Sequence, residues 1–335
     1  AIAIVGWDDD YAKENFPVRP AGNGAFLCKN SWGKDFGDNG YFYISYYDDF
    51  LGMQEFSMAF GKISSDNTCN RIYQYDPLGA TTAFGYNDEL YCANVFPENG
   101  QKLTRKEQLG SVSFYTYDNN YNYEVYIVSS FKNQNSFQKL PSPAARGNCR
   151  YAGYHTVDFS RPVTLKAGTR FAVVIKLWSS TGAKTYFEAP LNGTSSRATA
   201  SDGESYISHH GDIWTDFNTY LPNTNVCIKA FTNGKITENV PAAGSDGKDI
   251  SCESYSAEEL KERGFLLNPA YEDGNSDMVS SVSTGNAPSA SAPVLPAAYD
   301  LRQSGRVSPV KNQGEQGLCW TFSTYASLES FLLCS

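Results

Sequence analysis

Residues 72–233 read almost entirely as short strands in which apolar and polar residues alternate, and this pattern restricts the fold more than any other feature. In SVSFYTY, the alternation puts Val112 and Phe114 on one face. Turn sequences such as DNNYN, KAGTR and LPNTN separate the strands. Short alternating strands at this spacing predict a β-sandwich or jelly roll. The same period of two puts further residues on single faces: Phe171, Val173, Ile175 and Leu177 in RFAVVIKL, and Val226, Ile228 and Ala230 in NVCIKAF.

Composition and charge limit the classes of protein to which the chain can belong. Its 335 residues suffice for about two domains, and 41% of them are hydrophobic. No apolar run approaches the roughly 18 residues that a membrane-spanning helix needs, so no membrane-spanning segment is expected. The net charge of −9 argues against a nucleic-acid partner and for an exported acidic protein.

The segments that flank the strand-rich middle differ from it and from each other. Residues 1–62 contain three strand-like stretches, AIAIVGW, GAFLCKNSW and GYFYISYY. Residues 234–295 are rich in Gly, Ser, Ala, Pro and acidic residues, as in a linker. One short helix is expected there in SAEELKERG, where Ser256 and Glu259 form a capping box. Residues 296–335 look ordered again and end in an apolar, helix-like run.

Cys319 opens that helix-like run and follows the turn-rich loop NQGEQGL. A thiol at a helix N-terminus lies at the positive end of the helix dipole, which favours the thiolate that acyl transfer needs. The side-chain amide of Gln313 is a candidate to form an oxyanion hole with the backbone N–H of Cys319. For an isolated cysteine, a buried structural thiol beside a turn is the alternative interpretation.

The context of Cys319 favours the catalytic interpretation. The stretch PAAYDLRQSGRVSPVKNQGEQGLCWTFSTYASLES resembles the start of the mature domain of papain-like cysteine peptidases, with KNQG, the Cys-Trp pair and the following FS at the family's spacing. Near the other end of the chain, AIAIVGW, KNSWG and GDNGYFYISYYD resemble the last third of the same fold. The family has another cysteine three residues before the nucleophile, where this chain has Gln316, and Leu318 replaces the usual small residue. Lys29 and Ser31 of KNSWG are expected to have only surface and strand roles.

The resemblance implies a role for each matching residue. Cys319 would be the nucleophile and Gln313 the oxyanion donor. Asn30 would orient the catalytic imidazole, and Trp32 would shield that hydrogen bond from water. Trp320 would pack behind the nucleophile.

No histidine in the chain has the family's motif. The family's histidine immediately precedes the segment that matches Ala1, so the general base is expected just before this residue. The three histidines present, His155, His209 and His210, fall in the strand-rich middle without the family's flanking residues. Surface loop positions are expected for all three.

The two peptidase-like pieces stand in reverse order along the chain, and their spacing excludes a simple circular permutation. In the family, about 130–150 residues separate the cysteine from the histidine and asparagine. Here only residues 320–335 follow Cys319. We therefore expect either a fragment of a tandem protein, which we favour, or a truncated or misjoined product. In both cases Asn30 and Cys319 need not serve one active site, and the two pieces should lack folding partners.

The strand-rich middle resembles the lectin-like β-sandwich that follows the catalytic domain in some bacterial and archaeal papain-like peptidases, through YQYDPLG, GYHTVDFS, LKAGTRFAVVIKLW and GESYIS. A sugar-binding interpretation would use Trp178, Tyr206 and Trp214 as stacking faces. Large aromatic side chains are often buried, so core or interface positions are the favoured alternative.

The fold class expected from both resemblances is α+β at the ends and all-β in the middle. Residues 1–62 would be the C-terminal part of a papain-like domain, and 296–335 an N-terminal part. The lectin-like sandwich or jelly roll would occupy 72–233, and 234–295 would be a linker.

Cysteine usage adds little to these assignments. The eight cysteines occur at irregular spacings without a CxxC pair, so no metal site is expected, and no cofactor is expected either. Cys28 and Cys227 lie in strand-like segments and are expected to be buried, inert thiols. Four others are candidates for pairing in an oxidising compartment: Cys69, Cys92, Cys149 and Cys252.

Two functions remain open at this point. The first is an extracellular or cell-wall-associated thiol protease that hydrolyses a peptide or protein substrate through an acyl-enzyme; this chain alone, without the base, would be inactive. The second is a non-catalytic protein that binds cell-surface carbohydrate or another surface through the β-sandwich. The intact cysteine and asparagine motifs favour the peptidase.

Overall fold

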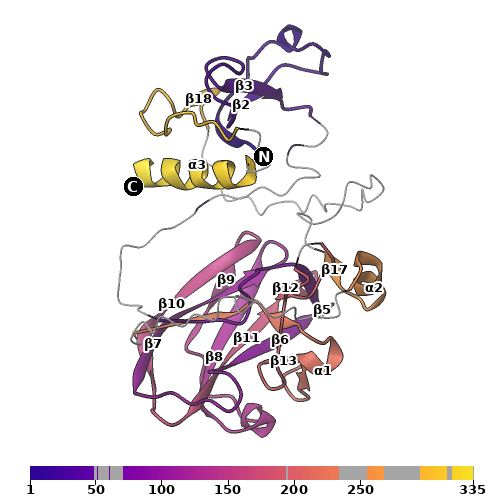
Figure 1. Cartoon of the computed structure of the whole chain (residues 1–335), viewed down its shortest axis with the longest axis vertical. Helices are drawn as coiled ribbons and strands as arrows, with labels where there is room; N and C mark the ends of the chain where they lie inside the picture. Colours follow the sequence, from indigo (N-terminus) through magenta and orange to yellow (C-terminus); the bar gives the residue numbers. More distant parts are fainter. Residues whose placement is uncertain are drawn as a thin grey trace. The chain divides into compact units, whose positions relative to one another are not determined.

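The computed structural model describes residues 1–48, 51, 60, 71–193, 195–233, 255–267, 295–314 and 319–334. The chain divides into two compact units, one made of residues 1–65 and 274–335 and the other of residues 66–273. In the first unit, the indigo start and the yellow end of the chain lie together (Figure 1). No helix in the described part of the chain is long and apolar enough to cross a bilayer.

The first unit contains one antiparallel sheet in the order β18-β1-β2-β3. Strand β1 pairs with β18, so that Gly6 lies opposite Asp300 and Trp7 opposite Tyr299. A Cβ atom on Gly6 would lie 2.2 Å from the carbonyl oxygen of Tyr299, so this close pairing requires glycine. The elements are β1 (Ala3–Asp8), the 3₁₀ turn η1 (Lys13–Asn15), β2 (Ala25–Lys29), β3 (Tyr41–Ser45), β18 (Ala298–Asp300) and α3 (Cys319–Cys334).

The expectation that the two peptidase-like pieces would lack folding partners is wrong. The indole N–H of Trp7 donates to the carbonyl of Pro296 at 2.9 Å, and the hydroxyl of Ser323 in α3 donates to the carbonyl of Ile2 at 2.6 Å. Helix α3 contacts β1 (Figure 1). The start and the end of the chain therefore complete one sheet. Three backbone hydrogen bonds add to this pairing, from the N–H groups of Asp9, Leu301 and Gly33 to the carbonyls of Ala297, Val5 and Lys311.

The second unit is the predicted β-sandwich. Its strands form a six-stranded sheet (β14-β13-β6-β11-β8-β9) and two four-stranded sheets (β10-β7-β16-β4 and β15-β12-β5-β17), and every pairing is antiparallel. The strands of the six-stranded sheet are β6 (Glu89–Phe96), β8 (Tyr121–Phe131), β9 (Ala145–Cys149), β11 (Arg170–Trp178), β13 (Ser205–Ser208) and β14 (Thr215–Asp216). The other strands are β4 (Arg71–Tyr73), β5 (Thr82–Tyr86), β7 (Glu107–Thr116), β10 (Gly153–Leu165), β12 (Ala183–Glu188), β15 (Asn225–Val226), β16 (Lys229–Thr232) and β17 (Leu266–Leu267). Three short helical segments lie in the described part of this unit: η2 (Gln134–Phe137), α1 (Phe217–Tyr220) and α2 (Ala257–Glu262).

Strand β11 is buried on both faces. The residues predicted to share one face, from Phe171 to Leu177 in steps of two, are all fully buried in the main core. The intervening Ala172 and Val174 are equally buried, in a second core beneath Phe137 of η2. The alternation therefore predicted correctly which residues enter the main core. Ala172 and Val174 face a second core instead of water, which explains why these positions of RFAVVIKL are apolar.

The other predicted faces are also buried, but one predicted strand is interrupted. Val112 and Phe114 of β7 are fully buried, as are Val226, Ile228 and Ala230. Between β15 and β16 the chain changes sheet, because β15 pairs with β12 whereas β16 pairs with β4 and β7. The segment NVCIKAF thus joins two sheets over one core.

Part of the segment predicted as a linker belongs to the sandwich. Helix α2 begins at the predicted capping box, in which Ser256 accepts from the N–H of Glu259, and it ends before Gly264. Leu260 and Phe265 are buried in the main core, and β17 pairs with β5. Residues 255–267 are therefore structural, and the rest of that segment lies outside the described residues.

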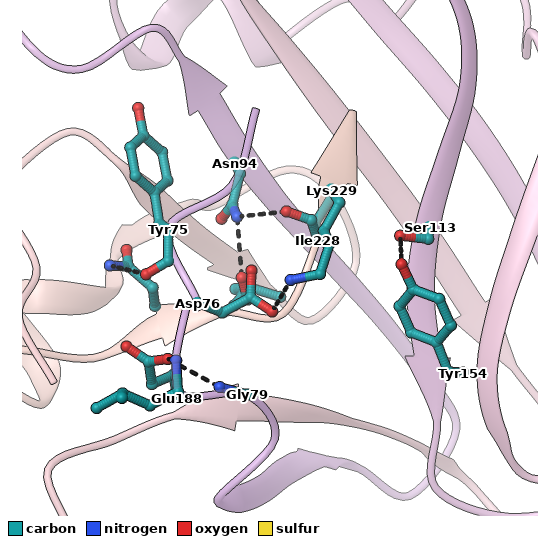
Figure 2. Close-up of polar contacts among 12 residues, drawn as sticks. Tyr75, Asp76, Gly79, Asn94, Ser113, Tyr154, Glu188, Ile228 and Lys229 are labelled. Atoms are coloured by element: carbon teal, nitrogen blue, oxygen red, sulfur yellow. Dashed lines mark hydrogen bonds and ion pairs between the residues drawn. The ribbon is translucent and has the colours of Figure 1, made fainter. Parts of the chain in front are cut away.

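A buried polar cluster joins the start and the end of the sandwich sequence (Figure 2). Asp76, which follows β4, is 2% exposed and forms an ion pair with Lys229 of β16 at 2.6 Å. Glu188, at the end of β12, accepts hydrogen bonds from the N–H groups of Leu78 and Gly79. Burial raises the pKa of Glu188 to about 8, the N–H of Leu78 opposes this rise, and the nearby Asp76 adds to it.

Replacing Glu188 by glutamine is expected to remove a pH dependence of stability. In the unfolded chain the carboxyl ionises near its ordinary pKa of 4.5, and in the folded chain only near 8. Between these pH values the folded state holds more protons, so the free energy of unfolding falls as pH rises, by on the order of 3 kcal/mol. Urea unfolding at pH 5 and pH 8 measures this loss. The loss should shrink in Glu188→Gln and persist in the exposed control Glu262→Gln; equal losses in both variants would contradict the assignment.

Candidate active site

Asn30 follows β2 and is held by the edge of the first unit's sheet. Its backbone N–H donates to the carbonyl of Gly40 at 3.0 Å, and its Oδ1 accepts from the N–H of Ser31 at 2.8 Å. The residue is only 7% exposed. Both of these contacts are made within residues 30–40, so the N-terminal piece supplies local support for this residue.

Ser31 connects Asn30 to Gln313, the predicted oxyanion donor. The N–H of Gln313 donates to the carbonyl of Ser31 at 2.8 Å, and Oγ of Ser31 donates to Oε1 of Gln313 at 2.6 Å. This pair of bonds orients the carboxamide of Gln313. The expectation of a strand role without further function is therefore wrong for Ser31, which positions a candidate site residue 282 positions away.

Lys29 is a buried anchor between the two pieces and has no surface role, contrary to expectation. It is 5% exposed, and its Nζ donates to the carbonyl and the hydroxyl of Ser308 at 2.7 and 2.9 Å. Burial lowers the pKa of Lys29, and the charge of Lys311 lowers it further. The sequence did not predict this contact. A lysine is rarely buried unless it has a partner, and nothing near Lys29 in the sequence identifies Ser308 as that partner.

Cys319 is the first residue of α3, as predicted, and is partly exposed. Its pKa is lowered chiefly by a hydrogen bond with the amino group of Ala1 and by that group's charge, while partial burial opposes the shift. Ala1 and Asn30 line the same small pocket, together with Ser323 of α3. The structure thus brings Cys319, Asn30 and Gln313 into one unit.

The two tryptophans of the motifs are exposed. Trp32 is 54% exposed, pairs with Asn312 in a backbone bridge and packs edge-on against Phe36 at 5.0 Å between ring centroids. Trp320 is 62% exposed, so the packing expected behind the nucleophile is not observed. Gln316 and Leu318 lie outside the described residues.

The three histidines all lie in the sandwich unit. His155 is in β10, half-buried, with Nε2 3.0 Å from Oγ1 of Thr116, and burial lowers its pKa. The predicted loop position is therefore wrong for His155. His209 and His210 follow β13 and are at least partly exposed, as predicted.

Two of the three candidate sugar-stacking aromatics are core residues. Tyr206 and Trp214 are 7% and 4% exposed and pack on Phe137, with ring centroids 5.3 and 4.4 Å from it. Neither can offer a face to a ligand. Trp178 remains partly exposed at the end of β11, with Nζ of Lys176 5.2 Å from its ring centroid.

Four cysteines of the described part of the chain are buried free thiols: Cys28, Cys92, Cys149 and Cys227. Cys28 and Cys227 are buried as predicted, and burial raises the pKa of each. Cys92 and Cys149 are also free rather than paired. The remaining candidates for pairing, Cys69 and Cys252, lie outside the described residues.

With this geometry in place, the comparisons with known proteins identify both units. Residues 1–60 and 295–335 match the papain family of cysteine proteases, and residues 72–232 match the lectin like domain. The chain therefore contains two segments that match the papain family of cysteine proteases and one that matches a lectin-like domain.

Particular relatives agree with this class. Cysteine proteinase 2 of Zea mays is 58% identical over 41 residues, which cover 12% of this chain and 11% of that protein. The oryzain gamma chain of Oryza sativa subsp. japonica is 39% identical over 82 residues, which cover 24% and 19% respectively. The clostridial cysteine protease Cwp84 after propeptide cleavage is similar in structure, with a TM-score of 0.57 and 29% identity over 69% of this chain and 57% of that chain.

A second structure covers both domain types. It contains the cysteine protease and lectin-like domains of Cwp84, described as a surface layer associated protein of Clostridium difficile, and gives a TM-score of 0.54 at 29% identity. The chain spans 51–57% of the two Cwp84 chains and 11–19% of the two plant proteins.

Lys29→Ala is expected to destabilise the first unit by about 2–4 kcal/mol, because it removes the donor of two buried acceptors on Ser308 and leaves a cavity. Hydrogen exchange of the amides of β1 and β2 reports this unit separately from the sandwich. The matched control is Lys34→Ala, whose side chain is exposed and should change stability by less than about 0.5 kcal/mol. Equal effects of the two substitutions would contradict the anchoring role.

Proposed function

We propose that the first unit carries the reaction centre of a papain-type cysteine peptidase, with Cys319 as its nucleophile. The observation that carries this proposal is the contact of Ser31 with Gln313, which joins the asparagine motif and the cysteine motif in one unit. The position of Cys319 as the first residue of α3 supports it, since a helix N-terminus favours the reactive thiolate.

The roles of the residues follow from thiol-protease chemistry. The thiolate of Cys319 attacks the carbonyl carbon of the scissile bond, and the resulting oxyanion accepts hydrogen bonds from the N–H of Cys319 and the amide of Gln313. The amine leaves with a proton from an imidazolium, and water then hydrolyses the acyl-enzyme. Asn30 would position that imidazole. Trp32 belongs to the same motif as Asn30, and Trp320 directly follows Cys319.

The wider setting is also a proposal. We infer that residues 1–62 supply the C-terminal part and residues 296–335 the N-terminal part of the peptidase fold, joined through the sandwich at 72–233 and the segment 234–295. The substrate would be a peptide or protein. An extracellular or cell-wall location agrees with the surface layer association given for Cwp84.

Alkylation of Cys319 by iodoacetamide, followed by peptide mass spectrometry across pH, tests the nucleophile. The lowered pKa predicts half-maximal reactivity below the ordinary value of 9.0, whereas Cys28 in the same chain should stay unreactive because it is buried and its pKa is raised to about 12. The chain should not turn over a peptide, because the nucleophile's unit contains no imidazole. Turnover that His155→Gln, His209→Gln or His210→Gln abolishes would contradict this assignment.

A one-residue extension sharpens the test. The amino group of Ala1 forms a hydrogen bond with the thiol of Cys319, so we propose that a histidine added before Ala1 has its imidazole within reach of the sulfur. Relative to a glutamine extension, the histidine extension should keep Cys319 reactive to lower pH, as expected of an imidazolium–thiolate pair. Identical profiles would contradict the proposed site geometry.

The match to the lectin like domain favours a second function, carbohydrate binding by the sandwich. Of the three candidate aromatics, Trp178 alone is partly exposed, with the ammonium of Lys176 over one face of its ring. A sugar ring could stack on this indole.

Trp178→Ala is expected to reduce retention on immobilised bacterial cell-wall polysaccharide by about tenfold, the equivalent of one lost stacking contact of 1–2 kcal/mol. Trp214→Ala should instead unfold or loosen the second core, because Trp214 is buried. Retention together with thermal unfolding distinguishes the two effects. Unchanged retention of a folded Trp178→Ala chain would exclude Trp178 from sugar binding.

A further inference from the structure

Two histidines and two carboxylates meet at one corner of the sandwich. His209 and His210 directly follow β13, while Asp88 and Glu89 stand at the start of β6. The two pairs are 121 positions apart in sequence, and the antiparallel pairing of β13 with β6 brings them together. Both strands belong to the six-stranded sheet (Figure 1), so the corner is built on a rigid part of the fold.

The imidazole rings are held by stacking. The ring of His209 lies 4.2 Å from that of Tyr86 at 18° between the planes, and 3.8 Å from that of His210 at 21°. Nε2 of His209 is within hydrogen-bond distance of Oδ1 of Asp88. One potential ligand atom from each of Asp88, His209 and His210 lies within 4.8 Å of the other two. The three potential ligand atoms therefore lie close enough together for side-chain rotation to place them around one ion.

Glu89 fixes the orientation of His210 from outside this group. Oε1 of Glu89 lies 3.2 Å from Nδ1 of His210, and Oε2 lies 2.8 Å from Nζ of Lys176 on β11. When Nδ1 of a neutral His210 carries the proton and donates it to the carboxylate of Glu89, the free lone pair of the imidazole is on Nε2. This carboxylate–histidine arrangement is the one that supports metal-ligating histidines in proteins.

We propose that Asp88, His209 and His210 bind one divalent transition-metal ion of the zinc type, with Glu89 as the residue that orients His210. Two imidazole nitrogens and one carboxylate oxygen suit Zn²⁺, Ni²⁺ or Cu²⁺ better than Mg²⁺, which prefers oxygen ligands. Three protein ligands leave a fourth position for water or for a group of a binding partner. The ion would join the turn between β5 and β6 to the end of β13 and stabilise the folded sandwich by mass action.

Local sequence could not suggest this site. Adjacent histidines lack the spacing of known zinc motifs, and the carboxylates are remote in sequence. The strand pairing, the stacking of His209 on Tyr86 and the stacking of His210 on His209 are the observations that bring the donors together.

The test is a titration of the full chain with Zn²⁺, carried out without an affinity tag and in a Cys319→Ser background that removes the partly exposed thiol of the described residues. Calorimetry should give one ion per chain, and thermal unfolding of the sandwich should shift upward with Zn²⁺ but not with Mg²⁺. His209→Gln and His210→Gln should each abolish this binding. Glu89→Gln should weaken it by about tenfold or more. His155→Gln, which alters the remaining histidine, is the matched control and should bind as the parent does.

Co²⁺ absorption identifies the ligands of the bound ion. Weak d–d bands without thiolate charge-transfer bands are expected for nitrogen and oxygen ligands. The proposal is overturned if the parent chain binds no Zn²⁺, if His209→Gln and His210→Gln bind as tightly as the parent, or if Co²⁺ shows thiolate ligation. Any of these results would mean that His209 and His210 form surface contacts with Asp88 and Glu89 and do not bind a metal ion.

Discussion

The antiparallel pairing of β1 with β18 is the interaction on which the first unit depends. It brings residues near the end of the chain alongside residues near its start, with Gly6 against the carbonyl of Tyr299. Once the strands pair, Lys29 reaches Ser308 and Ser31 reaches Gln313. A buried ammonium is stable only with its acceptors present, so these contacts make the pairing specific as well as favourable. The positions of Asn30 and Cys319 follow from this arrangement.

The sandwich rests on a different constraint, the double burial of β11. Its alternate residues enter the main core, and the residues between them enter a second core closed by Phe137, Tyr206 and Trp214. Buried charge inside the unit is compensated by ion pairing, most clearly between Asp76 and Lys229 (Figure 2). Aromatic residues that a sugar-binding interpretation would place at the surface are thus needed for packing, and only Trp178 of the three remains available.

Much of the fold could be predicted from local pattern, and the contacts between distant segments could not. Period-two alternation predicted the buried faces of β7 and β11, and the Ser256–Glu259 pair predicted the start of α2. The start of α3 at Cys319 also followed from the sequence. Pairing partners are not encoded locally, so the union of the two peptidase-like pieces was missed, and with it the buried role of Lys29. The burial of Tyr206 and Trp214 agrees with the favoured core interpretation, but local sequence could not identify η2, the segment that covers them, because it comes from a remote loop.

Amide hydrogen exchange at residues 33, 301 and 313 tests the central claim most directly, because the N–H groups of Gly33, Leu301 and Gln313 each donate across the boundary between the two pieces. The account predicts that all three exchange slowly in the full chain and at unstructured rates in separate peptides covering residues 1–65 and 274–335. Unstructured rates for these amides in the full chain would show that the pieces do not pair, and that Asn30 and Cys319 do not share a site.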